Sequence, residues 1–221
     1  MRKTVLLIGA SGLIGGELLN LLLKDDEIGT VKAFVRKPLK IKNDKLHQIC
    51  VDFEKLEEFD SEFKGDSLFC CIGTTRKKTP NLDVYKAIDY GIVLSSAKMA
   101  SNNKVPQIHL VSAIGADISS KIFYNLLKGE IEKDIVKIGF ESTFIYQPAL
   151  LIGKRFEMRP FEFLAQKIMP FFDLFLTKST KKYHSIRAEK VAKSMHMNFC
   201  TPKKGVTILE YNEMINGILL Q

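Results

Sequence analysis

Three side chains near the middle of the chain are of the types that move protons to and from a substrate oxygen. Tyr124 and Lys128 are four residues apart, so on a helix both side chains lie on the same face. A free tyrosine titrates too high to act efficiently at neutral pH, but a neighbouring ammonium stabilises the phenolate and lowers its pKa. Ser112 can hydrogen-bond the same oxygen. The three residues predict acid–base catalysis, although the Tyr-x-x-x-Lys spacing alone also fits an ordinary helix surface.

A glycine-rich turn close to the first residue predicts the cofactor that this chemistry needs. Gly9, Gly12 and Gly15 follow the apolar run 5–8 and precede the leucine-rich stretch 17–19. Between a buried strand and a helix, glycines at this spacing let backbone N–H groups approach a pyrophosphate at the helix N-terminus. The alternative is a glycine-rich turn without a ligand. Under the first interpretation, Lys128 also binds the nicotinamide ribose, and the residues of the turn that bind the dinucleotide are Gly9, Ser11, Gly12, Leu13 and Ile14.

The second expected strand ends in two cations, which bear on the choice between NAD and NADP. NAD sites usually carry an acidic residue about twenty residues past the glycine turn, where it binds the ribose 2′-hydroxyl. This chain has Arg36 and Lys37 there instead. Since an arginine can hold a 2′-phosphate through two hydrogen bonds, the pair predicts NADP (NADPH) as the cofactor. The competing interpretation is that both cations are simply exposed at the end of a strand.

Residues after the third and fourth expected strands extend the predicted cofactor site. Asp52 can accept a hydrogen bond from the adenine amino group while Phe53 packs near the ring, and Asp52 can equally cap the helix that follows. Gly73 and Thr74 are small residues at the end of the fourth strand, where they leave room for the ribose and the pyrophosphate. The predicted site therefore runs along the carboxyl edge of the sheet.

Apolar stretches alternate with helix-length segments along the chain. The expected strands are 4–8, 31–35, 47–51, 67–71, 107–111 and 143–146, and the expected helices are 16–24, 55–63, 82–100 and 123–138. Apolar strands separated by helices indicate an α/β fold with a doubly wound parallel sheet, the Rossmann fold. We expect residues 1–221 to form a single domain in which 149–221 mostly make a small C-terminal cap on the substrate side. The elements expected in that cap are a helix over 188–198, a strand over 206–209 and a final helix.

The overall charge and hydropathy exclude several classes of protein. The formal net charge of +8 fits a protein with polyanionic dinucleotide ligands, and the basic clusters are too short to predict nucleic-acid binding. No run reaches the eighteen or so apolar residues of a membrane span. The most apolar later segment, 161–176, is interrupted by charged residues and a proline, which favours a packed helical segment over an anchor.

The cysteines and histidines predict neither disulfides nor a metal site. Cys50, Cys70, Cys71 and Cys200 lack Cys-x-x-Cys spacing, and the four histidines are scattered without ligand spacing. Structural thiols fit a reducing compartment, so we expect a cytoplasmic protein that holds no metal.

These motifs together resemble the short-chain dehydrogenase/reductase superfamily, and in particular its atypical single-domain group related to the Tat-interacting protein. The resemblance covers nearly the whole chain and rests on segments 9–15, 71–76, 111–117, 124–130 and 147–148. It implies NADP binding and a centre made of Ser112, Tyr124 and Lys128. It also implies that Cys71 and Pro148 bind the cofactor.

Two further positions can be compared with that family. Asp89 stands where relatives have an Asn or Asp that braces the cofactor loop. Relatives usually have Arg-Pro-Gly where this chain has Gln147-Pro148-Ala149. Because that loop runs beside the nicotinamide in the family, the difference bears directly on the reaction centre.

Three functions are compatible with these residues. The first is an NADP-dependent oxidoreductase that transfers hydride to or from a small carbonyl or alcohol substrate. The second, which the family also implies, is an NADPH-binding regulatory or sensor protein without substantial turnover, with the basic clusters and 161–176 as its contact surface. The third is a nucleotide-sugar epimerase or dehydratase, for which the residues after Pro148 leave little room. We expect a small-molecule substrate as the main partner, and either a monomer or a homodimer.

Overall fold

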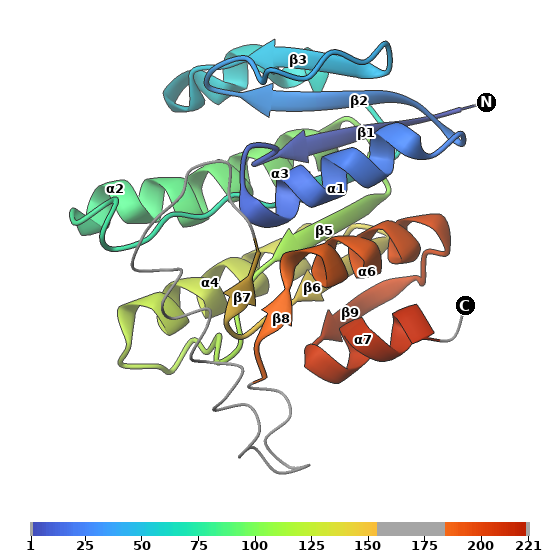
Figure 1. Ribbon diagram of the computed structural model, residues 1–221. Coiled ribbons are helices and arrows are strands. Elements are labelled where there is room, and N and C mark those ends of the chain that lie inside the picture. The colour runs from blue at the N-terminus through green and yellow to red at the C-terminus, as the bar shows by residue number, and fades with distance from the viewer. Residues whose placement is uncertain (1, 154–183, 220–221) are drawn as a thin grey trace.

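The computed structural model describes residues 2–153 and 184–219, and these residues build a seven-stranded parallel sheet with helices on both faces (Figure 1). The strand order is β3-β2-β1-β4-β5-β6-β9, and every pairing in the sheet is parallel. The order runs outward in both directions from the neighbouring strands β1 and β4. The predicted doubly wound Rossmann fold is therefore confirmed.

The elements follow the expected alternation closely. The strands of the main sheet are β1 (Lys3–Ile8), β2 (Ile28–Val35), β3 (Leu46–Cys50), β4 (Ser67–Cys70), β5 (Gln107–Val111), β6 (Ser142–Tyr146) and β9 (Gly205–Leu209). The α-helices are α1 (Leu13–Lys24), α2 (Leu82–Lys86), α3 (Val93–Asn102), α4 (Phe123–Ile138), α6 (Ala188–Cys200) and α7 (Tyr211–Leu219). Each expected strand and helix has a counterpart, and β5 and α4 fall on their expected ranges.

Two apolar layers hold the helices against the sheet. On one face, leucines of α1 and apolar residues of α6 share a core with side chains of the sheet, and α1 and α6 lie side by side (Figure 1). On the other face, α3 and α4 pack on a second core that includes Leu6, Leu68 and Leu110. Because side chains of a strand alternate between faces, each central strand contributes to both cores. Burial on both faces explains why these strands are predominantly apolar.

Two expected helices differ from regular α-helices. The segment expected over 55–63 is a 3₁₀ helix, Phe53–Glu62, with a non-helical backbone at Lys55. The helix expected over 82–100 is interrupted by a π-helical stretch, Ala87–Ile92, between α2 and α3. This stretch contains Asp89, which belongs to the site described below.

The described part of the C-terminal region is built into the main body of the fold. β9 extends the main sheet by pairing with β6, and α6 packs on α1. Outside the main sheet lies a two-stranded parallel sheet made of β7 (Leu151–Ile152) and β8 (Ile186–Arg187). The expectation that 149–221 mostly form a cap therefore misplaces α6 and β9, because a local pattern predicts a strand but not the neighbour with which it pairs. The apolar segment 161–176 lies outside the described residues.

None of the helices in the described ranges combines the length and the apolar character needed to cross a lipid bilayer. This agrees with the hydropathy of the sequence.

Candidate active site

A cavity of about 530 Å³ opens at the carboxyl edge of the sheet. It lies at the point where the strand order reverses, between β1 and β4, which is where open α/β sheets bind their ligands. Its volume is within the usual range for small-molecule and cofactor sites. The predicted site residues that line it are Gly9, Ser11, Gly12, Leu13, Ile14, Arg36, Phe53, Cys71, Gly73, Thr74, Ser112, Tyr124 and Lys128.

The glycine turn forms one wall of the cavity, and its shape depends on two of the glycines. Gly9 has a φ of +89°, and a Cβ there would lie 2.6 Å from the carbonyl carbon of Cys71. A Cβ on Gly15 would lie 2.1 Å from the carbonyl oxygen of Gly9, so only glycine lets the first turn of α1 pack this closely on the end of β1. The N-terminus of α1 then presents backbone N–H groups and a partial positive charge at the cavity.

At the far end of the cavity, Arg36 and Phe53 line the wall, whereas Lys37 and Asp52 lie outside it. Asp52 caps the 3₁₀ helix, since its carboxylate accepts a hydrogen bond of 3.0 Å from the Glu54 N–H. The structure thus brings one of the two predicted cations to the cavity. For Asp52 it shows the capping role that the sequence left open.

A buried ion pair connects the π-helical stretch Ala87–Ile92 with α4. Lys128 Nζ lies 3.1 Å from Asp89 Oδ2, and both side chains are almost fully buried. The other carboxylate oxygen, Asp89 Oδ1, accepts a hydrogen bond of 2.7 Å from the Thr74 N–H. Asp89 therefore braces the loop after β4 on the cavity wall, as the family resemblance implies. Since an unpaired buried charge would be costly, the pair also fixes the position of the ammonium.

The Tyr124 side chain reaches the cavity from the first turn of α4 and keeps 37% of its surface exposed. The Lys128 ammonium is 5.9 Å from the centre of its ring. Burial raises the pKa of Tyr124, Lys128 lowers it and the Asp89 carboxylate raises it again, so the pKa is above its ordinary value. Lys128 does lower this pKa, but the expectation that its charge brings the phenol below its ordinary pKa is wrong. The main reason is the burial of the phenol, and the Asp89 carboxylate adds to the shift.

Ser112 lies at the end of β5, where its side chain is held by a carboxylate that the sequence analysis missed. The Ser112 hydroxyl donates a hydrogen bond to Glu132 Oε1. The amide of Gln147 donates to both oxygens of the same carboxylate, at 3.0 and 2.9 Å. Burial raises the pKa of Glu132, although hydrogen bonds from Ser112 and Gln147, and the charge of Lys128, oppose the shift.

A signal for Glu132 was present in the sequence. Tyr124, Lys128 and Glu132 are each four residues apart, so all three lie along one face of α4. The sequence marks Gln147 as a departure from the Arg-Pro-Gly of the family that it resembles, but it does not predict the contact with Glu132. Pro148 lies outside the cavity lining, and its carbonyl oxygen accepts a hydrogen bond of 3.1 Å from the Ile114 N–H.

The donors around the cavity fit a pyridine dinucleotide. Backbone N–H groups at the start of α1 suit a pyrophosphate, and Arg36 suits an anionic group near the adenine ribose. The buried Lys128 and the phenol of Tyr124 lie on the wall contributed by α4. A dinucleotide that extends from Arg36 across the glycine turn would bring its other end to these two side chains.

Comparison with known proteins agrees with this assignment. An NAD(P)H-binding family model matches residues 9–137. Protein HTATIP2 of Rattus norvegicus is 34% identical over 217 residues, which cover 96% of this chain and 88% of the rat protein. Protein FMP52, mitochondrial, of Candida albicans is 34% identical over 161 residues, which cover 68% of each chain.

Solved structures share the fold at much lower identity. MoeE5 in complex with UDP-glucose and NAD has a TM-score of 0.71 at 15% identity, covering 99% of this chain and 82% of that chain. The Bordetella bronchiseptica enzyme WbmH in complex with NAD+ has a TM-score of 0.73 at 13% identity, covering 96% and 77%. With the family match and the similarity to HTATIP2 over nearly its whole length, this chain belongs to the NAD(P)H-binding family and is a homologue of HTATIP2.

Proposed function

We propose that this protein is an NADP(H)-dependent oxidoreductase that transfers hydride to or from a small carbonyl or alcohol substrate. One observation carries the proposal. The glycine turn and the side chains of Ser112, Tyr124 and Lys128 line the same cavity, although they come from separate parts of the chain. The same cavity therefore combines a site suited to a dinucleotide with side chains suited to proton transfer.

Arg36 supports NADP over NAD as the cofactor. It is exposed at the end of β2 and lines the cavity. Its guanidinium can bind a 2′-phosphate through two parallel hydrogen bonds, and no acidic residue stands at this strand end to bind a free 2′-hydroxyl.

The proposed chemistry divides between the cofactor and the protein. When bound, the nicotinamide would supply or accept the hydride. Tyr124 would give its phenolic proton to the oxygen of a carbonyl substrate, or take one from an alcohol. Lys128, held by Asp89, would stabilise the phenolate that remains after the transfer. Ser112 would hold the substrate oxygen next to the phenol, once its own hydrogen is released from Glu132.

The test is turnover of small aldehydes and ketones with NADPH by the Tyr124→Phe variant. This variant keeps the ring and loses the transferable proton, so we expect kcat to fall by at least about a hundredfold while NADPH still binds. Tyr211→Phe, on α7 and outside the cavity lining, serves as the control and should retain wild-type kcat. Unchanged turnover of every accepted substrate by Tyr124→Phe would contradict the proposed role.

The second candidate is an NADPH-binding regulatory or sensor protein without substantial turnover, and a specific feature of the site favours it. The Ser112 hydroxyl donates its hydrogen to Glu132 and burial raises the pKa of Tyr124, so neither group is poised for catalysis. Three results together would support this candidate: tight binding of NADPH, no NADPH oxidation with any carbonyl compound tested, and capture of a partner only when NADPH is bound. Capture that is indifferent to NADPH would contradict it.

For location and assembly, we propose a cytoplasmic protein that acts as a monomer or homodimer and has a small molecule as its main partner. The four cysteines are free, which suits a reducing compartment. The Candida albicans relative is named mitochondrial. A fluorescent fusion of the full-length protein decides between the two compartments, and recovery in mitochondria would contradict the cytoplasmic location.

A further inference from the structure

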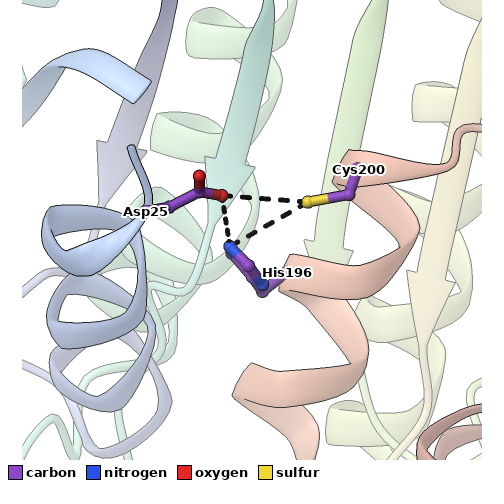
Figure 2. Close-up of side chains that lie close together, drawn as sticks. All are labelled: Asp25, His196 and Cys200. Atoms are coloured by element: carbon purple, nitrogen blue, oxygen red, sulfur yellow. Dashed lines mark hydrogen bonds and ion pairs between the residues drawn. The ribbon is translucent and has the colours of Figure 1, made fainter. Parts of the chain in front are cut away.

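A second group of reactive side chains lies at the other end of α1 from the glycine turn. Asp25, directly after α1, meets His196 and Cys200 of α6 (Figure 2). His196 Nε2 is 2.7 Å from Asp25 Oδ2, and Cys200 Sγ is 3.9 Å from the same oxygen and 4.0 Å from His196 Nε2. One nitrogen, one sulfur and one oxygen therefore face a common point.

The fold builds this cluster from two helices that pack side by side. His196 and Cys200 are four residues apart, so they lie on the same face of α6. Asp25 is 171 residues from His196 in the sequence and is brought to it by the packing of α1 on α6. The Glu27 N–H donates to Asp25 Oδ1 at 2.9 Å, which leaves Oδ2 for the other two side chains. This support of the carboxylate resembles the outer hydrogen bonds that orient metal ligands.

We propose that Asp25, His196 and Cys200 form a binding site for Zn²⁺ or a similar thiophilic divalent cation. Imidazole, thiolate and carboxylate are the zinc ligands of proteins, and three of them leave the fourth tetrahedral position for water. Tetrahedral coordination at ordinary zinc–ligand distances places the donor atoms about 3.4–3.6 Å apart. The observed separations of 2.7 to 4.0 Å bracket that range, so small rotations of the side chains complete the site.

Two of the three ligands differ in what binding requires of them. The pKa of Asp25 is lowered, because hydrogen bonds from Glu27 and His196 outweigh its burial, so Asp25 offers a carboxylate. Partial burial of the thiol and the charge of Asp25 raise the pKa of Cys200, so the cation must displace the thiol proton, which leaves to solvent as the sulfur–metal bond forms.

The site is accessible from solvent and is separate from the cofactor cavity. Cys200 is exposed, and Asp25 and His196 are partly exposed. The length of α1, on the order of 18 Å for its 12 residues, separates Asp25 from the glycine turn. Metal binding would join the end of α1 to the end of α6 and stabilise the folded state by linkage. The proposal therefore does not depend on the proposed function, and it replaces the expectation of no metal site.

Co²⁺ titration of the full-length protein, expressed without a histidine tag and treated with a chelator, tests the coordination directly. We expect a cobalt–thiolate charge-transfer band that saturates at one cobalt per chain. Cys200→Ser should abolish the band, whereas Cys50→Ser, which removes an exposed cysteine on β3, should retain it. Absence of the band in the wild type, or its persistence in Cys200→Ser, would overturn the proposal and leave Asp25 and His196 as a structural hydrogen-bonded pair only.

Thermal unfolding with Zn²⁺ alone tests the same site through stability. We expect Zn²⁺ to raise the Tm of the wild type, and His196→Gln and Asp25→Asn to need at least about tenfold more Zn²⁺ for the same shift. His47→Gln, an exposed histidine on β3, should respond like the wild type. Equal responses of His196→Gln and wild type would contradict the site, as would equal stabilisation by Mg²⁺ or Ca²⁺, which prefer oxygen ligands.

Discussion

At the scale of single residues, Glu132 has the largest effect on the role that Ser112 can have in the site. Its carboxylate takes the only hydrogen of the Ser112 hydroxyl, so with Glu132 ionised the serine can accept a hydrogen bond but cannot donate one to a carbonyl oxygen. When Glu132 is protonated, it can donate to the serine and free that hydrogen for the substrate. Gln147 contributes hydrogen bonds to the carboxylate without a charge. Because Gln147 is neutral, it does not add a positive charge that would keep Glu132 ionised. Glu132, whose pKa is raised, can therefore become protonated and release the Ser112 hydrogen.

The pH dependence of carbonyl reduction tests this arrangement at Glu132. Since burial raises the pKa of Glu132, its protonated form persists to higher pH than for a free glutamate. We expect kcat/KM to fall as pH rises through that pKa, by up to about tenfold per pH unit. Glu132→Gln, which cannot ionise, should flatten this limb of the profile. Glu130→Gln, two residues away and paired with Lys86, should leave the limb intact; a profile that is the same in all three proteins would contradict the account.

The proposed preference for NADP depends on Arg36. Arg36→Ala would remove the proposed charge-assisted contact to the 2′-phosphate, so NADPH affinity should fall by about ten- to a hundredfold while NADH affinity scarcely changes. Lys37→Ala is the matched control, because Lys37 lies outside the cavity lining and should matter little. Fluorescence titration with both nucleotides measures the effect. Equal losses for NADPH and NADH would mean that Arg36 has a structural role instead.

At the scale of elements, α1 and α4 each form a wall of the site, and in each case the spacing of a few residues in the sequence makes this possible. α4 presents Tyr124, Lys128 and Glu132 along one face, and the π-helical stretch Ala87–Ile92 brings Asp89 to the buried ammonium. α1 begins against the end of β1, at a distance that only Gly15 permits. Gly15 is therefore required for the packing of α1 on the end of β1, in addition to the glycines that allow a ligand to approach the backbone.

Alanine substitutions at two neighbouring glycines of α1 distinguish the effect of this close packing from the effect of helix propensity. Gly15→Ala should destabilise the fold by about 1–3 kcal/mol or more, because its Cβ would lie 2.1 Å from the Gly9 carbonyl oxygen. Gly16→Ala should be neutral or stabilising by up to about 1 kcal/mol, since its Cβ would meet the nearest atom at 3.6 Å and alanine favours a helix. Denaturant unfolding measures both; equal stability of the two variants would contradict the packing argument.

At the scale of the whole molecule, the sheet centres on a buried aromatic stack that contains His109. The His109 ring lies between Phe69 and Phe144, with ring centres 4.5 and 4.8 Å away, and its Nδ1 is 3.0 Å from the Tyr146 hydroxyl oxygen. Burial lowers the pKa of His109 from 6.5 to about 3. The folded protein therefore holds this imidazole neutral at the pH where an unfolded chain would protonate it.

Acid sensitivity follows from that difference. Stability from His109 is fully present above about pH 6.5 and is lost as pH falls toward 3, at a rate of about 1.4 kcal/mol per pH unit. We expect the free energy of unfolding to decline with this slope between pH 6 and pH 4, and His109→Phe to reduce the slope. His47→Gln, with an exposed imidazole, should keep it. An unchanged slope in His109→Phe would assign the acid sensitivity to other groups.

Most of the fold and most of the residues that line the cavity follow from local patterns, and the rest depends on which elements become neighbours. The apolar runs and the glycine turn predict the parallel sheet and α1, because burial and backbone geometry act locally there. The pairing of β9 with β6, and the meeting of Ser112, Glu132 and Gln147, join elements that are distant in sequence. The spacing of Tyr124 and Lys128 places them on one face of α4, but the pKa of the phenol also depends on Asp89.

The most direct test of the central claim is a crystal structure of the protein with NADP⁺ bound. The account predicts that the 2′-phosphate contacts Arg36, that the pyrophosphate lies on the N-terminus of α1 and that the nicotinamide lies beside Tyr124 and Lys128. A dinucleotide bound in the reverse direction, or with its nicotinamide out of reach of the Tyr124 hydroxyl, would contradict it.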